Sequence, residues 1–333
     1  MSDSARYLPL EKNSTMVDGS LEIAVLIPCL NEEQGIGGVV EDFRRALPGA
    51  TIYVYDNGST DRTIDVAREA GAIVRQEPRR GKGNVVRRMF ADVDADVYLM
   101  VDGDGTYDGG AAPGMIERLL GDHLDMVIAT RLDTEGSTFR AGHKAGNQGF
   151  ARLIAALFGR QLTDVFSGYR AMTRRFVKSF PGYSSGFEIE TELSVHALSL
   201  KIPMVEMPAP FGHRAPGSES KLSTFRDGTR ILRIVFYFLK EVRPLLFFTS
   251  LAVILAIISL ALAYPVITTY LDTGLVPRFP TAILATGVML IAFLFGACGL
   301  ILDSVAAMRW EAKRSAYLSE SAPGAPASRR EIS

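Results

Sequence analysis

The chain of 333 residues contains few cysteines and has almost no net charge. Its two cysteines, Cys29 and Cys298, are too few for a disulfide framework and lack the paired spacing of a zinc site. A formal net charge of -1 gives no electrostatic reason to expect nucleic acid as a partner. The first twenty residues lack the apolar stretch of a signal peptide, so we expect residues 1–20 to form a flexible tail.

Apolar residues are concentrated near the C-terminus. Residues 245–271 and 281–302 contain no charged side chain, and each run exceeds the roughly 20 residues that cross a bilayer. Two transmembrane helices within residues 244–304 are therefore expected, with a pair of buried core helices as the alternative. Residues 226–243 mix apolar and basic side chains and predict an amphipathic juxtamembrane helix.

Basic residues flank the two apolar runs on their outer sides. They are Lys221, Arg226, Arg230, Arg233, Lys240 and Arg243 before the first run and Arg309, Lys313 and Arg314 after the second. The loop between the runs offers only Arg278. Positive charge favours the cytoplasmic side, which predicts an integral membrane protein with its globular domain and a tail, residues 305–333, in the cytoplasm.

Residues 21–225 alternate between strand and helix patterns. Strands are expected at 21–30, 50–55, 72–75 and 97–101, separated by helices at 36–47, 61–70 and 82–91. Further strands are expected at 126–129 and 204–207, with helices at 150–158 and 191–200. This order predicts a doubly wound α/β domain that binds its ligand at the carboxyl ends of its strands. Residues 35–38 are glycine-rich but lack the G-x-G-x-x-G spacing of a dinucleotide site.

Two carboxylates follow the strand expected at 97–101. Asp102 and Asp104 are separated by one residue, so in extended backbone they project to the same side. Carboxylate oxygens are the ligands that Mg²⁺ and Mn²⁺ prefer, which makes this pair a candidate metal site. An acidic, glycine-rich turn is the alternative interpretation.

Several motifs occur in a specific order: Pro28-x-x-Asn31-Glu32, Asp56-Asn57-Gly58-Ser59-Thr60-Asp61-x-Thr63, Gly81-Lys82-Gly83, Asp102-x-Asp104 and Arg214-x-x-Gly217-x-x-Ser220-Lys221-Leu222. Together they resemble the polyprenyl-phosphate (dolichyl-phosphate-like) glycosyltransferases of family 2. The resemblance covers residues 21–225 and implies a GT-A fold, here a doubly wound mixed sheet.

The resemblance also implies site residues. Pro28, Asn31, Glu32, Asp56 and Lys82 would line the nucleotide pocket, and Asp102 and Asp104 would bind Mg²⁺ or Mn²⁺. Two positions depart from the family pattern, since Asn57 replaces a second acid and Thr106 stands where an amide is common. The third metal ligand therefore stays open between Thr106, Asp108 and water.

A lipid phosphate acceptor has a second pKa of about 6 and is largely dianionic at neutral pH, so it needs cations rather than a general base. Arg131, Arg140, Lys144, Arg214 and Lys221 are the candidates. By resemblance, Arg131, Arg214 and Lys221 fit best and act with Asp104 in catalysis. Glu188 and Glu190 are expected to contact the sugar or to begin a helix, and Tyr169-Arg170 resembles a family segment near the sugar.

The leading hypothesis is an inverting transferase that moves a hexose from a nucleotide sugar to polyprenyl phosphate at the cytoplasmic membrane face. Resemblance favours UDP-glucose, with GDP-sugars and a homo-oligomer left open. A polysaccharide synthase acting on a glycan or glycolipid is one alternative, but Ala306 replaces the glutamine of its Gln-x-x-Arg-Trp motif before Arg309-Trp310. A non-catalytic, membrane-anchored nucleotide-sugar-binding protein is the other.

Substitution of Asp104 separates an enzyme from a binding protein. We expect Asp104→Asn to abolish both the dependence on a divalent metal and turnover, because the amide replaces a charged metal ligand. Sugar transfer is measured with and without added metal. Unchanged behaviour of the variant would support a catalytically dead scaffold.

Overall fold

The computed structural model describes residues 21–133, 158–159, 162–186, 188–212 and 240–322. In chain order the elements are β1 (Ile23–Cys29), α1 (Ile36–Ala46), β2 (Thr51–Asp56), α2 (Thr63–Glu69), β3 (Ile73–Gln76), α3 (Lys82–Asp92), β4 (Val97–Met100), η1 (Gly109–Ala111), α4 (Ala112–Gly121), β5 (Met126–Asp133), β6 (Arg170–Thr173), α6 (Arg174–Ser179), α7 (Ile189–Leu200), β7 (Met204–Phe211), α9 (Pro244–Thr273) and α10 (Phe279–Ser319). The helices expected at 226–243 and 150–158 fall almost wholly outside the described residues.

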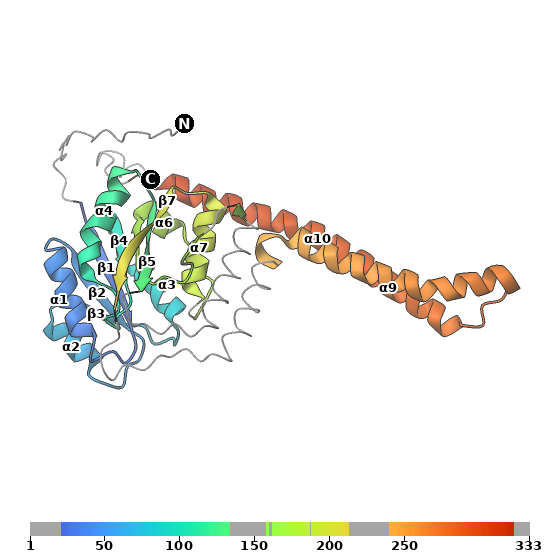
Figure 1. Ribbon diagram of the computed structural model, residues 1–333, viewed down its shortest axis with the longest axis horizontal. Coiled ribbons are helices and arrows are strands. Elements are labelled where there is room, and N and C mark those ends of the chain that lie inside the picture. The colour runs from blue at the N-terminus through green and yellow to red at the C-terminus, as the bar shows by residue number, and fades with distance from the viewer. Residues whose placement is uncertain (1–20, 134–157, 160–161, 187, 213–239, 323–333) are drawn as a thin grey trace, which may run out of the picture.

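The strands form one mixed sheet in the order β3-β2-β1-β4-β6-β5-β7 (Figure 1). β1 pairs in parallel with β2 and β4, as the alternation of strands and helices predicted. β6 runs antiparallel to both β4 and β5. The sequence did not predict β6, because its four residues follow a polar segment and lead directly into α6. The doubly wound α/β fold is confirmed, with β6 as the strand that makes the sheet mixed.

Helices cover both faces of the sheet, and alternate strand residues divide between two cores. In β1, Val25 and Ile27 pack with α1 and α4, whereas Ala24 and Leu26 pack with α3, α6 and α7. The helices present apolar faces at helical spacing, as with the buried Ile36, Val39, Val40 and Phe43 of α1. Figure 1 shows α1, α2 and α4 on one side and α3, α6 and α7 on the other.

The direction of the connections reverses at β1, since β2 and β3 lie on one side of it and β4 on the other. Such a reversal opens a crevice beyond the carboxyl ends of the two central strands. β1 ends at Cys29, β2 at Asp56 and β4 at Met100, so the residues that follow these strands meet at one edge. β5 also points toward this edge, because it is antiparallel to β6.

Two long apolar helices, α9 and α10, project from the sheet domain as a hairpin (Figure 1). Both are long and apolar enough to cross a membrane, and only 6% and 17% of their most apolar windows are buried. Core helices of a soluble domain would be mostly buried, so exposed apolar surface of this extent favours contact with lipid. Small residues bring the helices together: the Ser259 hydroxyl donates to the Ala285 carbonyl at 2.7 Å, and Gly299 packs on Phe248.

The C-terminal part of α10 continues beyond the apolar run 281–302 and returns to the sheet domain (Figure 1). Its Trp310 indole donates to the Ser199 carbonyl at 2.9 Å. The Tyr317 hydroxyl donates to the fully buried carboxylate of Asp125 at 2.6 Å, and Arg175 both pairs with Asp125 and lies over the Tyr317 ring. α10 is therefore one helix that joins the apolar hairpin to the sheet domain.

The Tyr317 contact predicts a measurable contribution to stability. Tyr317→Phe removes one donor from the buried charge of Asp125, which costs about 1–2 kcal/mol and lowers the apparent melting temperature by about 2–6 °C. The measurement is thermal unfolding of the detergent-purified chain. Tyr264→Phe, an exposed tyrosine on α9, is the matched control. Equal melting temperatures for the two variants would contradict the docking of α10.

Candidate functional site

Asp102 and Asp104 lie just beyond β4, at the edge where β1 and β4 end. Asp104 is buried, and its Oδ1 accepts hydrogen bonds from the Thr106 hydroxyl at 2.7 Å and the Thr106 amide at 3.2 Å. Thr106 thus positions Asp104 by donating to it. Asp108 instead caps η1 by accepting from the Gly110 amide at 2.8 Å. Thr106 and Asp108, the two candidate third metal ligands from the protein, therefore each already make a hydrogen bond within the chain.

Glycines let the chain approach the two carboxylates closely. A Cβ atom at Gly103 would overlap Cys29 Sγ, so the segment after β4 packs directly on the end of β1. A Cβ atom at Gly168 would lie within 3 Å of all three carboxyl atoms of Asp102. The Gly168 amide donates to the Tyr107 hydroxyl at 3.1 Å. The turn before β6 is therefore a wall of the Asp102 site.

Lys82, at the start of α3, holds the acidic side of the site together. Its ammonium pairs with Asp102 and, at 2.5 Å, with Oε1 of Glu190 in the first turn of α7. Burial lowers the pKa of Lys82, but the two carboxylates raise it more, so the pKa lies above its ordinary value. Lys82 is therefore charged at neutral pH. This pairing joins two residues that the sequence suggested separately.

The ends of β1 and β2 are linked by hydrogen bonds between their loops. The Asn31 carbonyl Oδ1 accepts from the Thr60 amide at 2.8 Å, and the Glu32 amide donates to Thr63 Oγ1 at 2.8 Å. Asp56 is fully buried and accepts from the Gly58 and Ser59 amides. Pro28 is buried within β1. The fold thus brings together the four residues of these two strand ends that we expect to line the nucleotide pocket: Pro28, Asn31, Glu32 and Asp56.

Asn57 explains one departure from the family pattern. Its amide group donates to the carbonyls of Glu77 and Arg79, at 2.9 and 2.8 Å, and its Oδ1 accepts from the Gly81 amide at 2.6 Å. An ionised aspartate has no proton to donate and would leave both carbonyls without this partner. Asn57 therefore fixes the segment that delivers Lys82 to the site.

Arg131, at the end of β5, forms a bidentate ion pair with Asp164, with N–O distances of 2.7 and 2.8 Å. Its guanidinium lies 5.6 Å from the centre of the Phe211 ring. Burial lowers the pKa of Arg131 and the Asp164 carboxylate raises it above its ordinary value. Sequence reasoning missed Asp164, because no local spacing connects it with β5.

The side chains of Tyr169 and Arg170 are fully buried. Their segment follows Gly168, which lies against Asp102, and its proximity to the sugar stays a prediction. Arg170 donates to the carbonyls of Ser167 and Val165, each at 2.9 Å, and burial lowers its pKa to about 10. It remains charged at neutral pH and holds the turn that carries Gly168.

The other basic candidates, Arg140, Lys144, Arg214 and Lys221, lie outside the described residues. Their segments follow β5 and β7, and both strands end at the edge that carries Asp102. Across the residues with defined positions, no group of three or more His, Cys, Asp or Glu side chains is arranged to hold a metal ion.

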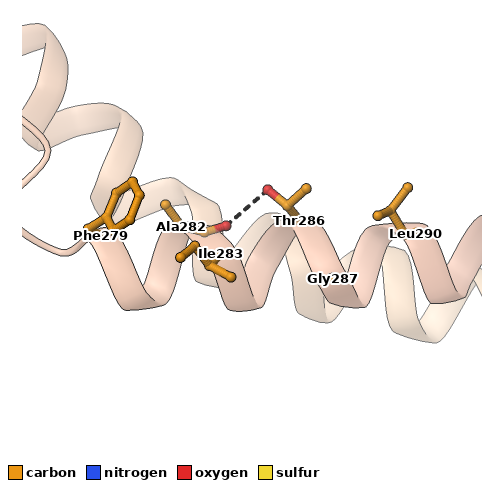
Figure 2. Close-up of a pocket in the computed structure, with 6 residues that line it drawn as sticks. All are labelled: Phe279, Ala282, Ile283, Thr286, Gly287 and Leu290. Atoms are coloured by element: carbon orange, nitrogen blue, oxygen red, sulfur yellow. Dashed lines mark hydrogen bonds between the residues drawn. The ribbon is translucent and has the colours of Figure 1, made fainter.

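A shallow pocket lies on the N-terminal part of α10, away from the edge of the sheet that carries Asp102. Figure 2 shows its lining residues, Phe279, Ala282, Ile283, Thr286, Gly287 and Leu290. The Thr286 hydroxyl donates to the Ala282 carbonyl at 3.0 Å, which satisfies the hydroxyl within the helix. The pocket belongs to the apolar hairpin and presents no group for catalysis.

Comparisons with known proteins identify the family of this chain. The family model described as glycosyl transferase family 2 matches residues 24–180. Protein RfbJ of Shigella flexneri is 56% identical over 126 residues, which cover 38% of this chain and 98% of the relative. A dolichyl-phosphate hexose transferase of Haloferax volcanii is 32% identical over 211 residues, covering 63% of this chain and 90% of the relative.

Solved structures share the fold. The crystal structure of glucosyl-3-phosphoglycerate synthase from Mycobacterium tuberculosis, in complex with Mn²⁺, UDP-glucose and phosphoglyceric acid, has a TM-score of 0.54 and 23% sequence identity. The alignment covers 66% of this chain and 79% of that chain. At this identity the likeness concerns the fold.

The contact between Gly168 and Asp102 predicts a sharp effect. Gly168→Ala places a methyl group on the Asp102 carboxylate, so the carboxylate must move. We expect the rate of sugar transfer to fall about 100-fold, because a misplacement of roughly 1 Å has an effect of this size. The melting temperature is expected to stay unchanged. Gly121→Ala is the control, because a Cβ atom there meets nothing within 4 Å. Full activity of Gly168→Ala would show that Asp102 does not need this position.

Proposed function

The chain belongs to glycosyl transferase family 2, and from this premise we propose that it moves a hexose from a nucleotide sugar to polyprenyl phosphate at a membrane surface. One observation carries the proposal. A partly buried ion pair of Lys82 and Asp102, with the buried Asp104 two residues further on, lies at the strand-end edge of a doubly wound sheet whose chain continues into an apolar helical hairpin.

The donor would bind across the ends of β1, β2 and β4. Asn31, Glu32 and Asp56 end or follow their strands and would contact the nucleoside, with Pro28 packing beneath it. Asp56 fixes the backbone of its loop through two amides, which would present a shaped surface to the base or ribose. Lys82 would offer a cation to the diphosphate.

A divalent cation, Mg²⁺ or Mn²⁺, fits Asp102 and Asp104. Both are hard oxygen donors, and the ammonium of Lys82 already occupies a position of positive charge beside Asp102. With two protein carboxylates, water and the diphosphate would complete the coordination, as is common for Mg²⁺. When bound, the ion neutralises the charge that develops on the departing diphosphate.

The acceptor would approach from the membrane. Arg131 ends β5 at the same edge as Asp102, and Asp164 holds its guanidinium in one orientation. Arg131, together with Arg214 and Lys221 from the segment after β7, would hold the lipid phosphate against the anionic donor. The lipid phosphate is a dianionic nucleophile, so its attack on the anomeric carbon would need no general base. Its oxygen would bond to the anomeric carbon as the bond to the nucleoside diphosphate breaks, and this single displacement would invert the configuration.

We propose UDP-glucose as the donor and glucose as the transferred sugar. The complex of the structurally similar glucosyl-3-phosphoglycerate synthase with UDP-glucose supports this choice. The polyprenyl acceptor is supported by the relative named dolichyl-phosphate hexose transferase. The basic flanks of the hairpin support a cytoplasmic position for the catalytic domain.

A donor screen tests the proposed function. Membranes containing the protein receive polyprenyl phosphate and one radiolabelled nucleotide sugar at a time: UDP-glucose, UDP-galactose or GDP-mannose. We expect label in the lipid fraction with UDP-glucose and its loss after chelation of divalent ions. Membranes containing Asp104→Asn give the background.

The outcomes separate the hypotheses. Lipid labelling from another donor would change only the sugar. Label in a free glycan or a protein, with none in the lipid, would overturn the polyprenyl acceptor and favour the polysaccharide-synthase alternative. Binding of nucleotide sugar without any transfer would favour the non-catalytic alternative.

A further inference from the structure

Lys82 forms ion pairs with two carboxylates that come from different parts of the sheet domain. Asp102 follows β4 and Glu190 lies in the first turn of α7, and both pair with the same ammonium. The side chain of Lys82 is only 10% exposed and that of Glu190 only 7%, so water contributes little to either charge. The two carboxylates are therefore the main compensation for this cation.

The pairing conflicts with the proposed metal site. A divalent ion on Asp102 would lie next to the Lys82 ammonium, and two cations at such short range repel strongly in a partly buried site. Metal binding therefore requires Lys82 to leave Asp102. The flexible four-carbon stem of lysine allows such a movement, provided that another anion receives the charge.

Glu190 has a carboxylate oxygen that can accept the displaced ammonium of Lys82. Its Oε1 already contacts Lys82 at 2.5 Å. Its Oε2 is buried and accepts no hydrogen bond from any residue that the structure places. A buried oxygen without a partner is costly, and an ammonium displaced from Asp102 would bind both oxygens of Glu190.

We propose that Glu190 is a positioning residue that takes over Lys82 when a divalent cation binds Asp102. Lys82 occupies Asp102 as an internal counter-ion in the metal-free protein. Metal entry transfers the lysine to Glu190, which leaves Asp102 to the metal and keeps the ammonium close to the diphosphate. This inference rests on the metal site of the proposed function.

Metal affinity without donor tests the inference independently of turnover. The detergent-purified full chain is titrated with Mn²⁺, and free Mn²⁺ is followed by electron paramagnetic resonance. Glu190→Gln keeps the size of the side chain but removes its charge, so of the two carboxylates only Asp102 is left to pair with Lys82. We expect Mn²⁺ affinity to fall about tenfold. Lys82→Met removes the competing cation and is expected to raise Mn²⁺ affinity.

A double variant distinguishes positioning from a simple field effect. If Glu190 acts through Lys82, Glu190→Gln changes Mn²⁺ affinity by less than about threefold in the Lys82→Met background. If Glu190 attracts the metal directly, the tenfold loss persists there, and the proposal is overturned. Glu192→Gln is the matched control, because this buried carboxylate on α7 accepts hydrogen bonds from the Tyr183 and Ser184 amides.

The remaining outcomes are also decisive. Unchanged Mn²⁺ affinity in Glu190→Gln overturns the inference and leaves the proposed metal site intact. Absence of Mn²⁺ and Mg²⁺ binding by the unmodified chain overturns both. If Glu190→Gln does not fold, Lys82→Met alone decides, since weaker or equal Mn²⁺ binding by that variant contradicts an internal counter-ion.

Discussion

The parallel strands β1, β2 and β4 end along one edge of the sheet, and the rest of the site depends on this constraint. Because the strand order reverses at β1, the segments after β1 and β4 lie side by side at this edge, which is where open α/β sheets bind ligands. Gly103 permits their contact at Cys29. The antiparallel β6 begins at the same edge and adds the turn that carries Gly168 against Asp102.

Buried charge is balanced within this framework in two ways. Lys82 and Arg131 each pair with carboxylates, so their charges are compensated while they remain beside the crevice. Arg170 is instead satisfied by backbone carbonyls and the Ser194 hydroxyl, and it stabilises the turn before β6. A buried cation without such partners would cost several kcal/mol. Lys82 and Arg131 are thus positioned at the site, whereas Arg170 has a structural role, and residue type alone does not distinguish these roles.

The membrane hairpin and the sheet domain are physically connected through α10. With a rise of about 1.5 Å per residue, its 41 residues extend about 60 Å, roughly twice the thickness of the hydrocarbon core. Beyond the apolar run, Trp310 contacts Ser199 of α7, and Tyr317 contacts Asp125 and Arg175 of α6. A continuous helix anchored at both ends would limit how far the strand-end edge can tilt relative to a bilayer, which would suit the lipid acceptor that we propose.

The sequence by itself determined most strands and helices, the Asp102-x-Asp104 pair at a strand end and the two apolar helices, because periodicity and apolar length are local properties. Only the tertiary structure decided the antiparallel β6, the burial of Tyr169 and Arg170, the link from Arg131 to Asp164 and the docking of Tyr317 on Asp125, 192 residues away. These features depend on which distant segments pack together. For the same reason, the sequence proposed Lys82 and Glu190 separately, and only the fold joined them to Asp102 through one ammonium.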